Sequence, residues 1–582
     1  MLSLIQGIKG IKKYRRRCNM IILGVNGWME RSHDAAACLV IDNQIIAMAE
    51  EERFIRQKNS FDRLPLNAIA YCVQEGKIRP DDIDVIAWGW DFPLVYKLHG
   101  REFPYDTNAL NGLLFPKKYY PRKERMIPVE FISHHLAHAA SVYCARENDE
   151  PLPIIVVDGE SEDCSVSIFL GREGKIEKVR EYPVQVSPGF FYEAGCKYLG
   201  FTTWQAGKLM GLACYGEPAL VNFFELVNGG GVIAPLSSLK LVANNTLDWE
   251  EEIVDIWMSR FEKEWGSKKN PSYSFLTSSG SFRPVLEPGI REKNIAASIQ
   301  SELERVYGWY VSEAVRITGH RNIALAGGVA LNCSANGMLL DCGFAESICI
   351  QPASNDPGVA IGAAVLMLGE ITPGLLRTPY LGPQFSRDEM FSLLKKVKAN
   401  FVEPKDIYLE SAKALEGGEV VGWFNGRMEF GPRALGGRSI LADPRRRDMH
   451  SIVNNIKTRE LWRPLAPSVL EGGAGDFFSS GRKSPYMLIR DYVRAEKASQ
   501  IPAVVHVDYS SRLQTVSKSF NPCYYELLSS FQSLTGVPVL LNTSFNSEKE
   551  PIVCSPPDAL KTFYETGMDL LALGPFLVKK WR

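Results

Sequence analysis

Short apolar runs separated by polar loops organise the first part of the chain. In residues 20–54, "MIILGVNGWMERSHDAAACLVIDNQIIAMAEEERF", three apolar runs are separated by a polar loop and by an Asp-Asn turn. This pattern predicts three strands, the last two joined by a tight turn. Residues 153–182, "PIIVVDGESEDCSVSIFLGREGKIEKVREY", repeat the pattern with an "REG" turn. We therefore expect a duplicated domain in which each copy opens with a three-stranded meander.

The repeated meanders, each followed by helical segments, indicate an ATPase of the actin and sugar-kinase type, by analogy of fold alone. In that arrangement the first loop of each copy faces the phosphates of the nucleotide. Residues 322–339, "NIALAGGVALNCSANGML", add an apolar strand that enters two glycines and then a helix. Backbone amides at such a helix start can approach an anion or a nucleoside closely.

A linker is predicted around residues 367–385, where Gly and Pro are frequent and periodicity is weak. We place the first domain at residues 20–375 and the second at residues 376–582, in a chain of mixed α/β (α+β) class. A length of 582 residues exceeds what one hydrophobic core supports, which agrees with two domains. Residues 1–19 are expected to be a tail, because a clean strand pattern begins directly after them.

Composition limits the classes of function. Lys and Arg number 66 and Asp and Glu 67, so bulk charge does not favour a protein that coats nucleic acid or membrane. No apolar run approaches the roughly 20 residues that a membrane span requires. The twelve cysteines are scattered without a C-x-x-C pair, which favours a reducing cytoplasm. Neither nucleic acid nor membrane is expected as a partner, and a homodimer stays open.

Three of the eight histidines, His134, His135 and His138, fall within five positions in "ISHHLAHAASVY". On a helix with Ser133 as its N-cap, His134 and His138 share one face at i and i+4. Two imidazoles so placed can bind one metal ion. The zinc-protease motif uses the same spacing but has a glutamate where His135 stands, so this is a different kind of site.

Acidic residues that follow strands are candidates for the other ligands. We favour Asp356, with Asp158 nearby or acting through water. Two histidines and one carboxylate suit ferrous iron, with Zn, Mn and Mg as alternatives. The competing interpretation is that these are ordinary surface histidines of a helix. His33, in the first loop of the first copy, could accept a proton at neutral pH, and a structural role for it stays equally open.

A local excess of positive charge lies in residues 427–463. Eight arginines and Lys457 stand there against four acidic residues, inside a chain that is nearly neutral. Glycines thread the stretch, as in "FGPRALGGRS", and arginine forks beside exposed backbone amides suit phosphate oxygens. A solvated basic face is the alternative, although such faces usually alternate with acids. The stretch therefore predicts a site for a polyanion.

Seven motifs occur in a fixed order along the chain. They are "SHHLAHAAS", "VVDGESE", "GKLMGLACYG", "AGGVALNCSANG", "FGPRALGGRSILADPR", "VNNIKTRELWRPLAPSVL" and "LNTSFN". Together they resemble the NodU/CmcH family of O-carbamoyltransferases, from about residue 20 to the C-terminus. The opening "LGVNGWMERSHDAAA" is most similar to the antibiotic-tailoring branch of that family.

The resemblance implies two active sites. A C-terminal domain similar to YrdC would join carbamoyl phosphate to ATP, with Mg²⁺ accompanying the nucleotide, and would release pyrophosphate and form carbamoyladenylate. An N-terminal domain similar to the tRNA threonylcarbamoyl-transferring ATPases would move the carbamoyl group to a hydroxyl of a small-molecule acceptor and release AMP. Positioning and charge neutralisation would supply most of the rate.

The resemblance also implies site residues. Those that bind carbamoyl phosphate and the ATP phosphates would be Arg433, Lys457, Arg463, Arg512, Asn542, Thr543 and Ser544, with Arg433 and Lys457 acting in catalysis. Those that line the nucleotide in the N-terminal domain would be Lys208, Gly327, Gly328, Asn332 and, by approximate position only, Asp248. A metal that bridges the adenylate phosphate would be held by His134, His138, Asp356 and Asp158. His33 would deprotonate the acceptor hydroxyl.

The chain departs from the family pattern at one position. Several relatives follow "LNTSFN" with a small residue, a basic residue and "GEP", whereas this chain has "LNTSFNSEKEP", with Glu548 where the cation is expected. Either Lys549 substitutes for that cation or the phosphate contact is absent. Absence of the contact predicts a weaker apparent affinity for carbamoyl phosphate.

Two other functions compete with carbamoyl transfer. A tRNA-modifying enzyme would use the basic stretch to bind tRNA, but the fused order of the domains and the neutral net charge disfavour it. A nucleotide-dependent regulator of the actin-like class would leave the histidine cluster and the second domain without a role. The acceptor stays open among sugar, aminocyclitol and polyketide hydroxyls, because no readable pattern encodes its pocket.

Overall fold

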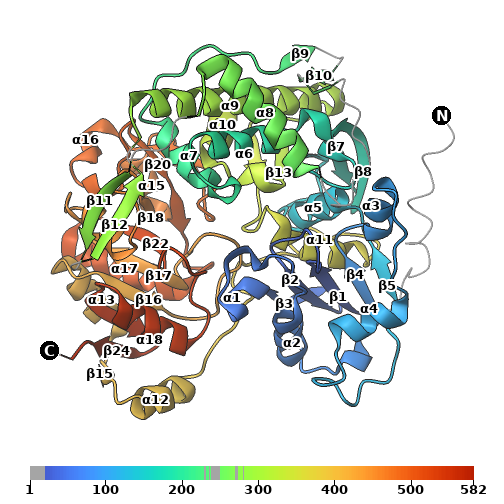
Figure 1. Ribbon diagram of the computed structural model, residues 1–582. Helices are drawn as coiled ribbons and strands as arrows, with labels where there is room; N and C mark the ends of the chain where they lie inside the picture. The colour runs from blue at the N-terminus through green and yellow to red at the C-terminus, as the bar shows by residue number, and fades with distance from the viewer. Residues whose placement is uncertain are drawn as a thin grey trace.

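The computed structural model describes residues 20–227, 231–234, 236–237, 249–268, 273–278, 281–286 and 288–581, with 273–278 and 281–286 described by their backbone alone. Three large sheets and the helices around them make up these residues (Figure 1). The predicted tail and Asp248 lie outside the described residues.

The first sheet has the strand order β3-β2-β1-β4-β5. Its strands are β1 (Ile21–Asn26), β2 (Ala36–Ile41), β3 (Gln44–Glu50), β4 (Val85–Trp88) and β5 (Val129–Phe131). β1, β2 and β3 form an antiparallel meander, and β4 and β5 continue the sheet parallel to β1. Both faces of β1 and β2 are buried, which explains why their sequences are apolar without alternation.

The second sheet repeats this arrangement in the order β8-β7-β6-β13-β14. Its strands are β6 (Leu152–Val157), β7 (Cys164–Arg172), β8 (Lys175–Pro183), β13 (Asn322–Ala326) and β14 (Ser347–Cys349). Here β6, β7 and β8 form the antiparallel meander, and β13 and β14 run parallel to β6. The two sheets share strand order and strand directions, which is the duplication that the sequence predicts.

Helices α5 (His134–Tyr143) and α11 (Val359–Leu366) join the two sheets through one hydrophobic cluster. A Cβ atom on Gly362 would lie only 1.7 Å from the carbonyl oxygen of Ala137, so the two helices touch backbone to backbone. This close packing fixes the position of α5. Because α5 begins with the histidine motif, its N-terminal end is held rigidly where the two copies meet.

The remaining helices of the first half surround these sheets, some through contacts with other helices and some at the interface with the second half. They are α1 (Glu51–Ile55), α2 (Leu66–Glu75), α3 (Phe92–Leu98), α4 (Thr107–Leu114), α6 (Pro188–Tyr198), α7 (Ala206–Ala213), α8 (Glu250–Trp265), α9 (Ile290–Thr318) and α10 (Cys333–Asp341). Large aromatic side chains such as Phe191, Trp257 and Tyr307 fill the core beside the second sheet. Two separate hairpins, β9 (Glu225–Val227) with β10 (Gly231–Ile233) and β11 (Tyr273–Ser278) with β12 (Ser281–Leu286), complete this half.

Residues 367–386 connect α11 to the third sheet and contain no helix or strand. That sheet has eight strands in the order β15-β24-β23-β16-β17-β22-β18-β21. They are β15 (Asn400–Val402), β16 (Val421–Phe424), β17 (Arg438–Ala442), β18 (Ala466–Leu470), β21 (Gln514–Val516), β22 (Val539–Ser544), β23 (Leu570–Leu573) and β24 (Phe576–Lys579). Both parallel and antiparallel pairs occur, so the chain is of mixed α/β class, as predicted.

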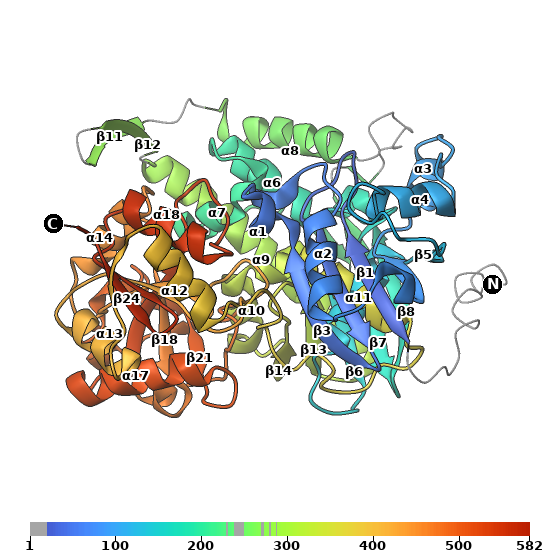
Figure 2. The same ribbon diagram turned by 90° about the horizontal axis from the view of Figure 1, so that it is seen from below.

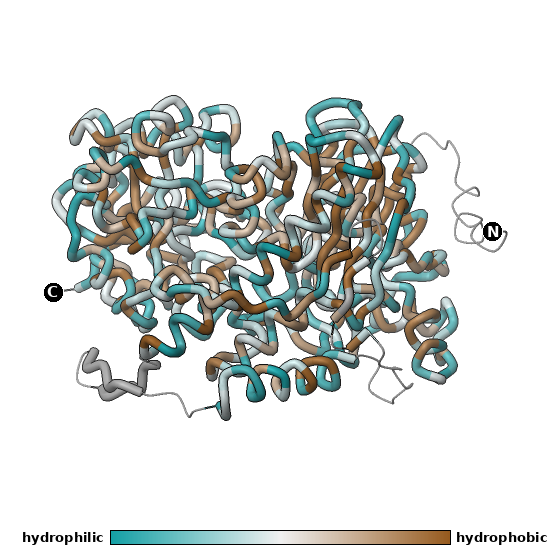
Figure 3. Tube along the Cα trace, turned by 90° about the horizontal axis from the view of Figure 1, so that it is seen from above, coloured by the Kyte–Doolittle hydropathy of each residue, from teal (hydrophilic) through white to brown (hydrophobic). Residues whose placement is uncertain are grey.

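Helices lie on both faces of the third sheet over two hydrophobic clusters. They are α12 (Arg387–Lys396), α13 (Ile407–Glu416), α14 (Met449–Ile456), α15 (Ala474–Phe477), α16 (Ala495–Ala498), α17 (Pro522–Thr535) and α18 (Pro556–Glu565). A short ribbon of β19 (Arg490–Tyr492) and β20 (Ser510–Arg512) lies beside them. Figure 3 shows hydrophobic stretches inside both halves, with hydrophilic segments around them.

The two halves meet through α1, α7 and α10, which lie beside the third sheet and its helices (Figure 2). Arg53 of α1 donates to the carbonyl of Gly431 at 2.7 Å. Asn336 of α10 donates to the carbonyl of Leu488 at 2.8 Å. Polar contacts of this kind fix which loops of the two halves face each other.

Candidate metal centre and anion cluster

His134 and His138 lie one turn apart on α5, and their Nε2 atoms are 3.1 Å apart. Ser133 occupies the N-cap position, but its side chain does not cap the helix. Glu162 does so instead, because its Oε1 accepts a hydrogen bond of 2.8 Å from the backbone amide of His134. The prediction that the side chain of Ser133 caps the helix is therefore wrong. The capping carboxylate comes from the loop between β6 and β7, which the local sequence of the helix could not reveal.

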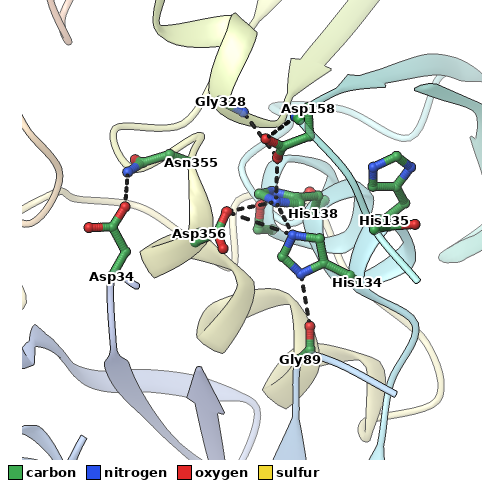
Figure 4. A network of polar contacts seen from close by, with 12 residues as sticks. Asp34, Gly89, His134, His135, His138, Asp158, Gly328, Asn355 and Asp356 are labelled. Carbon is green, nitrogen blue, oxygen red and sulfur yellow. Dashed lines mark hydrogen bonds and ion pairs between the residues drawn. The ribbon is translucent and has the colours of Figure 1, made fainter. Parts of the chain in front are cut away.

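The ring of His134 is oriented by its neighbours. Its Nδ1 donates to the carbonyl oxygen of Gly89 at 3.1 Å, so its Nε2 carries the free lone pair. Trp90 stacks on the ring with a centroid distance of 3.8 Å. The Nε2 atom is thereby aimed at the second histidine and at the carboxylates, as Figure 4 shows.

Two carboxylates complete the histidine cluster, which we define as His134, His138, Asp158 and Asp356. Asp158 follows β6, and its Oδ2 lies 3.1 Å from the Nε2 of His138. Asp356 begins the short 3₁₀ helix η7 (Asp356–Gly358), and its Oδ1 lies 3.6 Å from that Nε2. One ligand atom from each of the four residues lies within 4.8 Å of all the others, so the structure brings together the four residues that the sequence singled out (Figure 4).

The charges of this cluster fit a bound cation. Two imidazole nitrogens 3.1 Å apart cannot both present lone pairs to each other without a proton or a metal ion between them. Burial opposes the charge of Asp356, yet the neighbouring histidines, His134 foremost, hold its pKa well below the usual range. Burial alone would lower the pKa of His138, but its hydrogen bonds to Asp158 and Asp356 raise it to about 9. The site therefore attracts positive charge, and its donors are those of a divalent transition metal.

His135 lies on the same helix and outside the cluster. Its Nδ1 is 2.8 Å from the hydroxyl oxygen of Ser167, and burial followed by the charges of the other two histidines holds its pKa well below the usual value. A buried, neutral imidazole on this side packs the helix against β7. This agrees with the absence of His135 from the predicted ligands.

The glycine pair after β13 approaches the same site. Gly328 donates its amide to Asp158 Oδ2 at 3.1 Å. Gly327 has a φ of +87°, and a Cβ there would lie 2.3 Å from the carbonyl oxygen of Val157. Asn332, four residues on, caps α10 through the amide of Ala335 and also pairs with Gln300. The pair of glycines thus borders the cluster, whereas the side chain of Asn332 is occupied elsewhere, because its oxygen caps α10 and its nitrogen donates to Gln300.

His33 lies at the edge of the cluster. Its Nε2 is 4.0 Å from Asp356 Oδ2 and its Nδ1 is 3.4 Å from Asp34 Oδ2, while Asp34 also accepts a hydrogen bond from Asn355 (Figure 4). Burial works against protonation, but Asp356 and Asp34 raise the pKa of His33 to about 10. Its side chain is 32% exposed, so it can be reached from solvent, and its ring packs edge-on against Trp204.

A second set of charged residues lies in the C-terminal half. We call it the cation cluster: Arg433, Lys457, Arg459, Arg463 and Arg512. The pKa of every member is lowered, by burial first and, for all but Arg512, then by neighbouring cations. Burial and the charge of Arg512 lower the pKa of Arg433 to about 9. The sequence had singled out four of these residues, and Arg459 only as part of the basic stretch.

Several donors of the cation cluster lack acceptors. Arg433 Nε, Arg459 Nη2 and Arg512 Nε are buried without a hydrogen-bond partner. Two carboxylates lie among the cations. Glu460 is 3.7 Å from Arg463, and Glu460 and then Glu548 partly offset the lowering of the pKa of Arg463 by burial. Five cations against two carboxylates leave a surplus of charge and donors that a bound phosphate would satisfy.

Lys457 is anchored on the loop that follows β22. Its Nζ donates to Asn546 Oδ1 at 2.7 Å and to Ser544 Oγ at 3.2 Å. Asn542 and Thr543 are buried on β22 itself. The side-chain amide of Asn542 donates to Ala434, Ser468 and Gln514, so it holds the loop that carries Arg433 against the sheet.

Contacts across the interface join the cation cluster to elements of the first half. Lys208 of α7 donates to Glu460 Oε1 at 2.7 Å and lies 3.8 Å from Glu548 Oε1. Arg433 reaches the carbonyl of Leu331, in the turn that follows the glycine pair, at 3.5 Å. Lys208 thus contacts the carboxylates of the cation cluster.

Comparison with known sequences decides the family. The family model described as "Carbamoyltransferase N-terminus" matches residues 21–365, and that described as "Carbamoyltransferase C-terminus" matches residues 412–580. The chain belongs to the carbamoyltransferase family. The N-terminal match of this carbamoyltransferase contains the whole histidine cluster, and the C-terminal match contains the whole cation cluster.

Relatives of this carbamoyltransferase include nodulation proteins. It is 36% identical to the nodulation protein NolNO of Sinorhizobium fredii over 96% of this chain and 83% of the relative. It is 30% identical to nodulation protein U of Rhizobium tropici over 88% and 89% of the two chains. Among solved structures, component A of the (R)-2-hydroxyglutaryl-CoA dehydratase of Acidaminococcus fermentans matches 60% of this chain and 98% of its own, with 14% identity and a TM-score of 0.32. Among the described helices, none combines the length and the apolar character needed to cross a bilayer.

Proposed function

We propose that this carbamoyltransferase is an ATP-dependent O-carbamoyltransferase that uses carbamoyl phosphate as its donor and a hydroxylated small molecule, such as an antibiotic or another natural product, as its acceptor. The observation that carries the proposal is the pairing of two unlike clusters. The second half holds a surplus of cations with unpartnered donors, and the first half holds a cluster of imidazoles and carboxylates that suits a cation. The reaction joins two polyanions, ATP and carbamoyl phosphate, which need the cations, and its later transfer step needs the histidine cluster.

The first half-reaction takes place at the cation cluster. Water cleaves carbamoyl phosphate to carbamate and phosphate, and a carbamate oxygen then attacks the α-phosphorus of ATP. Carbamoyladenylate forms and pyrophosphate leaves, and Mg²⁺, when bound with ATP, would neutralise charge on the phosphates. Arg433, Lys457, Arg463 and Arg512 neutralise the phosphate oxygens, which is the main requirement of phosphoryl and nucleotidyl transfer. Thr543 and Ser544 add hydroxyl donors at the end of β22.

The second half-reaction takes place at the histidine cluster. His33 would accept the proton of the acceptor hydroxyl in its neutral form, which a cation bound at the histidine cluster would favour by compensating the charge of Asp356 that raises the pKa of His33. The hydroxyl oxygen attacks the carbamoyl carbon, and the bond to the adenylate oxygen breaks to release AMP. The accessible edge of His33 fits this role. Gly327 and Gly328 let backbone amides approach the nucleotide, and Lys208 and Asn332 are proposed to line it as well.

A divalent metal, with Fe²⁺ favoured, belongs to the histidine cluster in this proposal. The two Nε2 atoms, Asp356 and Asp158 would hold it, and when bound it would neutralise charge on the phosphate of the leaving group. The orientation of His134 by Gly89 and Trp90 keeps its lone pair available without a bound ion. We further propose that residues 20–375 form a domain of the actin and sugar-kinase type and residues 376–582 one of the YrdC type. The repeated strand order of the first two sheets supports the former.

The test is release of pyrophosphate by the purified protein given ATP and Mg²⁺, with and without carbamoyl phosphate. Release that requires carbamoyl phosphate supports the first half-reaction, and its absence contradicts the proposal. His138→Ala should then abolish transfer to an acceptor and leave pyrophosphate release intact, because the adenylate forms at the other cluster. Loss of both activities in a variant with unchanged thermal stability would contradict the division of labour.

A further inference from the structure

Residues 56–62, which we call the connecting segment, belong to the first half of the chain and bind the second half. Arg56 donates to the carbonyl oxygens of Ile552 and Pro551 at 2.7 and 2.8 Å. Lys58 donates through its Nζ to the carbonyl oxygen of Glu548. One end of the segment is therefore fixed to residues 548–552 of the C-terminal half.

The loop to which Lys58 binds also borders the cation cluster. Lys457 holds this loop two residues earlier, through the side chain and carbonyl of Asn546 at 2.7 and 3.0 Å. Lys58 and Lys457 repel each other, and this repulsion is among the causes, after burial and Arg459, that lower the pKa of Lys457. Lys58 is thus a cation of the first half that lies within the field of the cation cluster.

The other end of the connecting segment holds the loop that carries His33. The amide of Asp34 donates to the carbonyl of Asn59 at 2.5 Å. The amide of Ala35 donates to the hydroxyl of Ser60 at 2.9 Å. Both contacts fall within two residues of His33, so any displacement of Asn59 or Ser60 moves the backbone of this loop.

Further contacts repeat this connection. The amide of Asp62 donates to the carbonyl of Ser32 at 2.9 Å. Phe61 packs on Trp204 with a centroid distance of 4.9 Å, and Trp204 packs on the ring of His33 at 4.4 Å. Backbone and side-chain contacts therefore both run from the segment to His33.

Backbone strain is concentrated in these two segments. Of the fourteen described non-glycine residues with positive φ, six lie within residues 31–34 and 56–62: Arg31, Asp34, Arg56, Asn59, Ser60 and Asp62. Such a conformation is energetically unfavourable for a residue with a side chain and persists where surrounding contacts impose it. A structure held by contacts against its own preference responds to small changes in those contacts.

We propose, on the basis of the function proposed above, that the connecting segment transmits occupancy of the cation cluster to the loop of His33, with Lys58 as the positioning residue. An anion bound among the cations compensates the repulsion that acts on Lys58 and so strengthens its contact with the loop at Glu548. Asn59 and Ser60 follow Lys58 in sequence and pull the His33 loop into its ordered position. The base of the transfer step is thus held more firmly when the first site is filled, which protects the adenylate from water.

Hydrogen–deuterium exchange of residues 30–36, measured by mass spectrometry with and without inorganic pyrophosphate, tests this coupling. In the native protein, saturating pyrophosphate should slow exchange in this peptide by about fivefold, the lower range of ordinary coupling energies. Lys58→Met should abolish the response, and Lys58→Arg should retain it. Lys77→Met, at an exposed lysine on the same half, is the matched control and should respond as the native protein does.

Calorimetry with pyrophosphate on each variant separates coupling from binding. Lys58→Met should keep its affinity within about fivefold and its thermal stability within a few degrees. Arg512→Met, which weakens the cation cluster, should lose binding and response together. A native response in Lys58→Met, or one that persists in Arg512→Met, overturns the proposal. Pyrophosphate bound to native protein without any change in residues 30–36 overturns the coupling alone, whereas failure to bind overturns the assignment of the cation cluster as an anion site and the proposed function with it.

Discussion

Replacing Arg433 by methionine should stabilise the protein when no anion is bound. Burial and the charge of Arg512 lower the pKa of Arg433 to about 9. An arginine stays charged at pH 7. The guanidinium therefore does not lose its proton, and its unfavourable environment lowers the stability of the folded state. Each pKa unit corresponds to about 1.4 kcal/mol, and the fall from 12.5 to about 9 therefore represents roughly 5 kcal/mol of desolvation and electrostatic cost.

The expected gain is smaller than this cost, because methionine replaces the stem but loses the contact of Arg433 with the carbonyl of Leu331. We expect the free energy of unfolding to rise by about 1–3 kcal/mol, because screening by solvent reduces the electrostatic cost that the substitution removes. For a domain of this size, the unfolding transition of the C-terminal half should rise by about 2–4 °C per kcal/mol.

Arg427 offers a matched control in the same basic stretch. Its guanidinium donates to Leu381, Gly382 and the hydroxyl of Tyr71, so its donors have acceptors. Arg427→Met should therefore lower stability by about 1–3 kcal/mol, the usual cost of unpaired buried groups.

The assay is differential scanning calorimetry of both variants, with and without pyrophosphate. A ligand at a hundred times its Kd stabilises the native state by about 2.7 kcal/mol, and this gain should be present in Arg427→Met and greatly reduced in Arg433→Met. If Arg433→Met lowers ligand-free stability as Arg427→Met does, Arg433 is a structural arginine, and the reasoning that assigns surplus charge to this site is refuted.

Three further predictions follow from local geometry. Gly327→Ala places a Cβ 2.3 Å from the carbonyl oxygen of Val157 at a residue with positive φ, and it should lower the free energy of unfolding in urea by more than about 2 kcal/mol. Gly207→Ala, in a helix with open space around the new Cβ, should raise it by about 0.5–1 kcal/mol. Equal effects of the two substitutions would contradict the close approach at Gly327. Glu548→Arg should strengthen the apparent affinity for carbamoyl phosphate in the pyrophosphate assay, and an unchanged affinity would rule out Glu548 as the reason for weak binding. Removal of metal by a chelator should lower the melting temperature of the N-terminal half and abolish transfer, and adding Fe²⁺ should restore both. A melting temperature and a transfer activity that do not change with the chelator would argue against a metal at the histidine cluster.

Local sequence determined much of the secondary structure of this protein. The meanders of residues 20–54 and 153–182 form as their patterns predict, because buried apolar strands and tight turns are encoded by neighbouring residues. The glycine pair after residues 322–326 precedes a helix for the same reason. Helical spacing also placed His134 and His138 on one face of α5, since the geometry of a single helix suffices for that.

Only the tertiary structure decided which distant residues meet. Glu162 caps α5 in place of Ser133, and Lys58 reaches the loop at Glu548, 490 positions away in the chain. Lys208 pairs with Glu460 across the two halves. Such contacts depend on how two sheets and their helices pack, and packing reflects the whole apolar surface of each element. The sequence therefore determined the residues and elements that carry the chemistry, and the fold decided the contacts through which they act together.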